Sequence, residues 1–263
     1  ARVIPFPVNE VTALGIETVA TAFACGAAEL RVLLGTRRRD DLGALERTLA
    51  LAEAVLRGWG FGTGRAAVQA ADEPDALAAA LATLGERDGV AAPRSFLPMG
   101  DKRGVMQTAL KELHKAAPAP ADVVALPEQA PFGTVHVDVA GCTLCLACVS
   151  ACPTGALRDN PDRPMLTFTE EACVQCGLCA NTCPERVITL EPRLNVAPEA
   201  ALPRLVKEEE PCSCIRCGRP FGVRSTVERV AAKLAGGHWM YRGNAANLEL
   251  IRMCEDCRVV AVS

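Results

Sequence analysis

Short apolar runs alternate with helically spaced apolar residues along roughly the first third of the chain. An extended segment at Val3 and Ile4 precedes a predicted helix from about Glu10 to Ala24, which Gly26 ends. The run LRVLL at Leu30–Leu34 then predicts a buried strand. An order of strand, helix and strand is typical of a parallel sheet with helices packed against it.

The same alternation continues with a second helix, a third strand and a third helix. The second helix ends at Gly58, and its apolar face is made by Leu42, Leu45, Leu49, Ala52 and Leu56. Ala66–Ala70 is the predicted third strand, and Pro74 opens a third helix, whose Leu77, Leu81 and Leu84 are expected to face inward. A three-stranded sheet would be thinly covered. We therefore expect upstream residues of a longer polypeptide, or another subunit, to complete it.

The glycine-rich stretch Gly58–Gly64 could be mistaken for a nucleotide-binding loop. A dinucleotide loop leaves a strand and opens a helix, so that the helix N-terminus faces the pyrophosphate. This stretch leaves a helix and enters a strand. We therefore predict a plain helix-to-strand connection. Further along, Lys102–Ala117 is predicted to be an amphipathic helix.

Composition and charge exclude several classes of function. Half of the 263 residues are hydrophobic, and 28 Lys and Arg oppose 31 Asp and Glu, giving a net charge of -3. Without a basic surface that attracts phosphates, nucleic acid is not an expected partner. No apolar run reaches the roughly 18 residues of a membrane span, and the first residues lack a signal-peptide pattern. We expect a cytoplasmic protein without a membrane span.

The cysteines are concentrated in the second half of the chain, where 13 of the 14 lie between Cys142 and Cys257. Clustered C-x-x-C spacings in a reducing compartment indicate metal binding rather than a disulfide framework. Cys25 lies apart from the others, and we expect it to be a small buried residue at a helix end without a function.

One cysteine pattern occurs twice. The pattern C-x-x-C-x-x-C-x-x-x-C-P runs from Cys142 to Pro153 and again, 31 residues later, from Cys173 to Pro184. An internal repeat of this kind indicates two equivalent halves. Three thiolates spaced in this way can surround one face of a cubic iron-sulfur cluster, and the cysteine before the proline belongs to the other cluster. The predicted ligands of one 4Fe-4S cluster are Cys142, Cys145, Cys148 and Cys183, and those of its twin are Cys173, Cys176, Cys179 and Cys152.

Residues 133–193 resemble a bacterial-type ferredoxin that carries two 4Fe-4S clusters. The resemblance rests on the doubled run and on the segments VHVDVAGC, GALRDNPDRPMLTF and RVITLEP, which precede, separate and follow the two cysteine runs as strands. It implies that the two clusters lie close enough for electrons to pass between them and on to a partner protein.

A third group of cysteines follows near the end of the chain. Cys214-x-x-Cys217 and Cys254-x-x-Cys257 supply four thiolates in two knuckles, a pattern typical of a closed structural zinc site. Cys212 could substitute as a ligand. This excess of sulfur keeps a mononuclear iron or a third iron-sulfur site open as alternatives to zinc.

Two helices are expected between the knuckles, folding back so that the cysteine pairs meet. The first carries a predicted capping box of Ser225 and Glu228 and stops at Gly236 and Gly237. The second runs from about Asn244–Met253. Metal binding would then hold together a module too small to be stable by itself.

Proline-rich stretches divide the chain into three predicted domains. We expect an α/β domain with a trailing helix at 1–117, a linker at 118–132, the dicluster ferredoxin-like domain at 133–193, a linker at 194–211 and a four-cysteine metal-binding module at 212–263. The predicted fold class is therefore multidomain, α/β plus α+β. It combines a small parallel α/β N-terminal domain, a ferredoxin-like domain and a small C-terminal helical module with metal knuckles.

The chain has no nucleophile-base arrangement and no phosphate-binding loop, which predicts a non-catalytic electron-transfer component of an oxidoreductase system. Over nearly its full length, including FLPMGDKR, EEEPCSCIRCGRPFG and LIRMCEDCR, it resembles bacterial 4Fe-4S proteins associated with molybdenum formate dehydrogenases. Its N-terminal domain and linked ferredoxin are also similar to heterodisulfide-reductase-type modules. The resemblance implies a formate dehydrogenase, or a similar molybdoenzyme, as redox partner. Two alternatives stay open: an assembly or maturation protein for such an enzyme, and an enzyme whose active site lies on residues further upstream.

Overall fold

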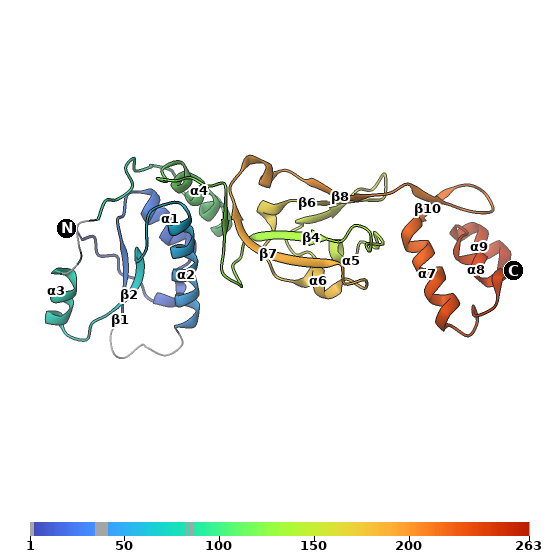
Figure 1. The fold of residues 1–263 in the computed structure, drawn as a ribbon, viewed down its shortest axis with the longest axis horizontal. Coiled ribbons are helices and arrows are strands. Elements are labelled where there is room, and N and C mark those ends of the chain that lie inside the picture. The colour runs from blue at the N-terminus through green and yellow to red at the C-terminus, as the bar shows by residue number, and fades with distance from the viewer. Residues whose placement is uncertain (1–2, 35–41, 83, 85–86, 263) are drawn as a thin grey trace. The chain divides into compact units, whose positions relative to one another are not determined.

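The computed structural model describes residues 3–34, 42–82, 84 and 87–262. These residues form nine α-helices and four small sheets of two or three strands (Figure 1). The chain divides into two compact units. The first contains Ala1–Ala130 and Pro192–Ala197, and the second contains Pro131–Glu191 and Pro198–Ser263.

The sheet of the first unit has two parallel strands, β1 (Leu30–Leu34) and β2 (Ala66–Ala70). Both strands were predicted from their apolar runs. The expected first strand of the sheet is wrong, because Val3 and Ile4 form no strand and are 52% and 77% exposed. The described part of the first unit therefore contains a thinner parallel sheet than the pattern predicted.

Three helices bury the core of the first unit. They are α1 (Ile16–Ala24), α2 (Gly43–Gly58) and α4 (Lys102–Lys115). The predicted helix from Glu10 starts later, because a short 3-10 turn, η1 (Val11–Ala13), comes first. Helices α1 and α4 pack together, and Trp59 at the end of α2 is fully buried, with its indole N–H donating to the carbonyl of Ala121 at 2.9 Å.

Two expectations for the first unit are wrong. Helix α3 (Pro74–Ala82) has no buried residue, and Leu81 is 36% exposed, so its leucines do not form the inward face that the spacing predicted. Cys25 is exposed, because it follows the last turn of α1 as its C-cap instead of lying within the buried face. Helical spacing identifies a common face but does not show that another element covers it.

The glycine-rich connection after α2 is held by a carboxylate of that helix. Glu53 accepts the backbone N–H groups of Gly64, at 2.7 Å, and of Ala66, at 2.5 Å. A Cβ added to Gly58 would lie 2.5 Å from a methyl carbon of Val124, so the glycine permits a close approach of the strand β3 (Val123–Ala125). These contacts agree with a structural connection.

The sheets of the second unit surround the two cysteine runs. Strand β4 (Gly133–Val137) lies beside β7 (Ile188–Asn195). The last residues of β7, Arg193–Asn195, belong to the first unit and pair there with β3. A second sheet is antiparallel, with the order β5 (Leu157–Asp159), β6 (Met165–Phe168) and β8 (Arg204–Glu208). Each cysteine run contains a short helix, α5 (Ala147–Ser150) in the first and α6 (Leu178–Thr182) in the second. Two 3-10 turns follow strands: η3 (Glu170–Ala172) comes after β6, and η4 (Pro198–Ala201) comes after β7.

Strand β8 lies in the segment 194–211 that the prolines predicted to be a linker. It pairs with β6, and the Arg204 guanidinium lies 4.9 Å from the centre of the Phe168 ring. Within β8, Val206 packs against the core, whereas Leu205 is 56% exposed. The strand was missed because a single inward apolar residue gives no alternating pattern.

The last part of the second unit contains a hairpin and three helices. The hairpin pairs β9 (Pro211–Ser213) with β10 (Pro220–Val223). It is followed by α7 (Arg224–Gly237), α8 (Ala245–Ile251) and α9 (Glu255–Val262), of which α9 was not expected. Helix α7 ends at the predicted glycines, but its N-cap is Val223, so the predicted capping box is wrong. The finer division into domains at 133–193 and 212–263 stays a prediction.

Candidate iron-sulfur and metal sites

The backbone of the two cysteine runs repeats as their sequence does. Positive φ angles occur at three pairs of positions related by the same shift of 31 residues: Leu144 (51°) with Gln175 (53°), Leu146 (60°) with Gly177 (76°), and Gly155 (64°) with Arg186 (55°). A side chain with a Cβ rarely adopts this left-handed region, because it brings the Cβ too close to the backbone. Strained backbone of this kind is typical of a site that must hold a ligand.

Such turns make concave surfaces lined with backbone N–H groups. In each loop the second left-handed residue, Leu146 or Gly177, lies directly before a short helix. Successive N–H groups around left-handed residues form the nests in which proteins bind anions, including iron-sulfur clusters. The loops are therefore suited to an anionic group surrounded by thiolates.

The structure brings the first predicted ligand set together around one pocket. Cys142, Cys145 and Cys148 of the first run line it together with Cys183 of the second run. Its apolar lining comes from both repeats and includes Val137, Leu144, Leu146, Leu166, Val187 and Ile188. The pocket thus brings together cysteines of both runs, and the exchange of ligands between two clusters stays a prediction.

Burial dominates the protonation of Cys148 in the first set. It raises the pKa of the Cys148 thiol to about 12, and the neighbouring thiols of Cys142, Cys145 and Cys179 add to the increase. A thiol in this environment stays protonated at neutral pH unless a metal or a cluster binds it. Cys179 belongs to the second predicted set, so Cys148 and Cys179 are the members that bring the two sets close to each other.

The second predicted set is also gathered in space. Burial raises the pKa of the Cys173 and Cys179 thiols, and the thiols of Cys152 and Cys176 raise both further. Burial opposes ionisation of Cys152 as well, but hydrogen bonds from Leu157, Thr154 and Ala156 lower its pKa. Cys152 of the first run therefore lies among the cysteines of the second run.

Neither set has the spacing of a site for a single metal ion. Four thiolates around one tetrahedral ion at about 2.3 Å lie roughly 3.8 Å from one another. Among the described residues, the eight cysteines of the two runs do not form such a tight group. Wide spacing, thiolate donors and inward N–H groups fit a cluster of several irons.

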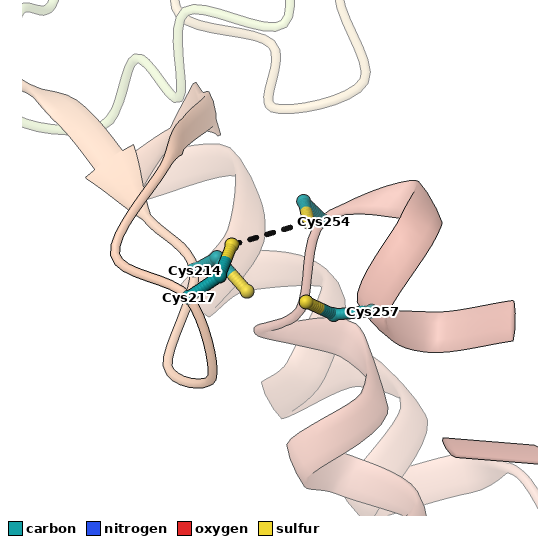
Figure 2. A group of neighbouring side chains, drawn as sticks. All are labelled: Cys214, Cys217, Cys254 and Cys257. Carbon is teal, nitrogen blue, oxygen red and sulfur yellow. Dashed lines mark hydrogen bonds between the residues drawn. The ribbon is translucent and has the colours of Figure 1, made fainter. Parts of the chain in front are cut away.

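The third cysteine group, in contrast, has single-ion spacing. The sulfur atoms of Cys214, Cys217, Cys254 and Cys257 all lie within 4.8 Å of one another, and those of Cys217 and Cys254 are 3.7 Å apart (Figure 2). The sulfur of Cys212 lies outside this group. The geometry fits one tetrahedral ion and is too compact for a cubic cluster.

A hairpin and a helix start hold these four sulfurs. The turn between β9 and β10 carries Cys214 and Cys217, and it closes where Gly218, at a φ of 76°, donates its N–H to the carbonyl of Cys214 at 2.9 Å. Cys254 and Cys257 come from the beginning of α9 (Figure 2). The N–H of Ile215 donates to the carbonyl of Arg252 at 3.1 Å and so joins the two knuckles.

Protons are unevenly distributed over this group. Burial opposes ionisation of Cys214, but hydrogen bonds from the backbone of Cys254, Cys217 and Arg216 lower the pKa of its thiol to about 6. Burial and hydrogen bonds with the other three thiols raise the pKa of Cys257 to about 12. A bound metal ion would therefore displace protons, which makes metal affinity dependent on pH.

Helix α7 is attached to the first cysteine loop by contacts that the sequence did not predict. The Ser225 hydroxyl donates to the carbonyl of Thr143 at 2.8 Å, and the Thr226 hydroxyl donates to the same oxygen. Arg229 holds Glu185, which lines the first pocket, through two nitrogens at 2.9 and 2.7 Å. No short-range sequence pattern indicates these contacts, because the partners are more than 40 residues apart.

Lys207 of β8 also reaches the first cysteine loop. Its ammonium group donates to the carbonyl of Cys142, and to that of Val139 at 3.1 Å, while it pairs with Glu209 at 2.7 Å. The acidic run Glu208–Glu210 before β9 therefore includes a carboxylate that balances a charge beside the site.

None of the helices in the described part of the chain is long and apolar enough to cross a membrane.

Comparison with known proteins supports the iron-sulfur interpretation for the middle of the chain. Residues 141–188 match the family model described as a 4Fe-4S dicluster domain. The chain is also similar to the polyferredoxin-like subunit of an aliphatic sulfonate oxidoreductase from Pyrococcus furiosus, with 42% identity over 40 residues. That match covers 15% of this chain and 23% of the relative. The chain therefore contains a ferredoxin-type 4Fe-4S domain, which supports a role in iron-sulfur electron transfer.

Proposed function

We propose that this protein relays electrons through two 4Fe-4S clusters, to or from an oxidoreductase with which it associates. The observation that carries the proposal is the doubled loop, in which two four-cysteine sets exchange one member and share the same left-handed turns. When bound, each cluster would accept and release single electrons.

The residues of the chain would perform three tasks in this relay. Cys142, Cys145, Cys148 and Cys183 would hold one cluster, and Cys173, Cys176, Cys179 and Cys152 the other. The apolar residues around the loops would keep water away, because ten residues of this core are buried, including three of the cysteines. The approach of Cys148 to Cys179 supports a short path between the two sites.

The finer parts of the proposal concern the third metal and the partner. We propose a structural zinc ion at Cys214, Cys217, Cys254 and Cys257, since four thiolates with single-ion spacing form a closed site. A molybdenum formate dehydrogenase is the proposed partner, on the basis of the sequence resemblance. We also propose a location in the reducing cytoplasm, on the basis of the clustered C-x-x-C spacings.

An anaerobic redox titration followed by EPR would test the proposal, with iron, sulfide and zinc measured on the same sample. We expect about eight irons and one zinc per chain. We also expect two clusters that are reduced reversibly and interact magnetically. Clusters that cannot be reduced reversibly, or iron for fewer than two cubanes, would contradict it. Tight binding of a client enzyme that survives loss of the clusters would instead support an assembly or maturation protein.

A further inference from the structure

The two cysteine loops differ at one position that faces a ligand sulfur. Gln175 and Leu144 are equivalent under the repeat and share the same backbone, with φ angles of 53° and 51°. Leu144 is 2% exposed and packs in the apolar core. Gln175 instead places its side-chain nitrogen 3.5 Å from the sulfur of Cys173. The second cysteine run thus has a side-chain N–H near the sulfur of a predicted ligand, where the first run has the apolar side chain of Leu144.

The contacts of Gln175 fix its amide in this orientation. The side-chain Nε2 donates to the carbonyl of Thr134 at 2.9 Å as well as to the sulfur of Cys173. A rotated amide would bring its oxygen against the Thr134 carbonyl, so that two acceptors would meet. The backbone N–H of Gln175 donates to the same sulfur, also at 3.5 Å. Cys173 therefore receives two hydrogen bonds from a single residue.

The neighbouring strand leaves room for this amide. A Cβ added to Gly133 of β4 would lie 2.6 Å from the amide carbon of Gln175 and 2.7 Å from its Nε2. Thr134 itself is 1% exposed, and Arg204 donates to its hydroxyl at 3.3 Å and to the carbonyl of Val135 at 2.7 Å. The slot that holds the Gln175 amide is thus built by residues of β4, with β8 supporting them.

From this geometry we infer that Gln175 raises the reduction potential of the cluster held by Cys173, Cys176, Cys179 and Cys152. The inference rests on the proposed electron-transfer function. A hydrogen bond to a ligand sulfur stabilises the reduced form, which carries one more negative charge, more than the oxidised form. The loop with Leu144 lacks this donor. Gln175 is therefore a positioning residue that makes two nearly identical sites unequal.

The test compares the full chain with Gln175→Leu, which reproduces the other loop, and with Gln175→Glu, which keeps the shape but has no N–H donor when ionised. Gln69→Leu, the same substitution on β2 of the first unit, is the matched control. In EPR-monitored titrations, we expect both Gln175 variants to lower one of the two midpoint potentials. The expected change is about tenfold in the reduction equilibrium, or about 59 mV for a one-electron couple. The other potential, and both potentials of Gln69→Leu, should stay in place.

A second readout separates this inference from the proposed function. Resonance Raman spectra of the oxidised clusters in H₂O and D₂O report hydrogen bonds to the ligand sulfurs without any reduction step. Part of the deuterium shift of the iron–sulfur modes should be lost in Gln175→Leu. If the clusters of the unmodified chain cannot be reduced reversibly, the relay fails, but this spectral comparison still decides the role of Gln175. Unchanged potentials with an unchanged deuterium shift, or an equal change of both potentials, would overturn the inference, and a chain that binds no iron would overturn both.

Discussion

The cluster loops and the C-terminal cysteine group hold their sulfurs in different ways. In the loops, cysteines lie in a core with large apolar residues such as Leu166 and Phe168, both 1% exposed. Among the described residues from Pro211 onward, only Cys214, Val227, Ala231 and Cys254 are buried. Two of these four residues are predicted ligands. The loops are therefore supported by an apolar protein core. In the C-terminal module, predicted metal ligands make up half of the buried residues.

This comparison predicts that metal loss would unfold the C-terminal module and spare the ferredoxin-type part. In Cys254→Ser, we expect the module to lose most of the stabilisation that a structural zinc ion supplies, on the order of 10 kcal/mol. Limited proteolysis should then cut within Pro211–Val262, and the helical circular dichroism of α7 to α9 should decrease. The visible absorption of the clusters is the internal control. A variant that stays resistant to protease would show that the module has a sufficient apolar core.

The exchange of ligands between the loops gives the next largest effect. Cys152→Ser and Cys183→Ser should each lose about half of the iron, because each removes one ligand of one cluster. Double substitutions show which cysteines bind the same cluster. Cys152→Ser with Cys173→Ser should lose no more iron than either substitution alone, since both would act on the same cluster.

A pair of substitutions that would affect both clusters is the matched control for the predicted exchange of ligands. Cys152→Ser with Cys142→Ser should lose nearly all of the iron, because the two substitutions would act on different clusters. If instead Cys152 and Cys142 behaved as members of one cluster, each run would hold its own cluster and the exchange would be wrong. Iron and sulfide analysis with EPR measures all four proteins.

The sequence predicted the cysteine groups more fully than the surrounding fold, for physical reasons. Ligand spacing is local: the run from Cys142 and its copy from Cys173 impose the same turns wherever they occur. Strand β8 and the contacts of α7 depend on distant partners. Ser225 shows the limit, because a residue expected to cap α7 donates instead to Thr143, which lies 82 residues away. Gln175 could have been found as a polar residue at the position where the first run has Leu144.

A smaller effect is expected where the two regions meet. Arg229 holds helix α7 to Glu185, which directly follows the second cysteine run, and the Arg229 guanidinium lowers the pKa of Glu185, whose side chain is 11% exposed. A depressed carboxyl pKa stabilises the folded state above the ordinary pKa of glutamate, about 4.3. This contribution is lost as the pH falls through the pKa of the folded state.

Arg229→Ala should therefore loosen α7 at neutral pH and weaken the pH dependence of its attachment at acidic pH. Hydrogen exchange of α7 should become severalfold faster in this variant. Zinc content should stay unchanged, because Arg229 pairs with Glu185 and supplies no ligand to the proposed zinc site. Arg224→Ala, at the start of the same helix, is a control for the loss of an arginine. Equal hydrogen-exchange rates in Arg229→Ala and the unmodified chain would show that the hydroxyl contacts to Thr143 are enough to hold α7 in place.

The smallest effect is expected at Cys212, whose sulfur lies 4.0 Å from the carbonyl oxygen of Ser213 and outside the four-sulfur group. Cys212→Ser should change the zinc affinity by no more than about twofold, since substitutions away from a ligand set alter stability by about 0.5 kcal/mol or less. Competition with a chromophoric chelator measures this affinity, with Cys254→Ser as the variant that loses it. A tenfold weaker affinity in Cys212→Ser would make Cys212 a ligand. The C-terminal group would then have more sulfur than a single tetrahedral ion binds, and an iron-sulfur site there would again become the better interpretation.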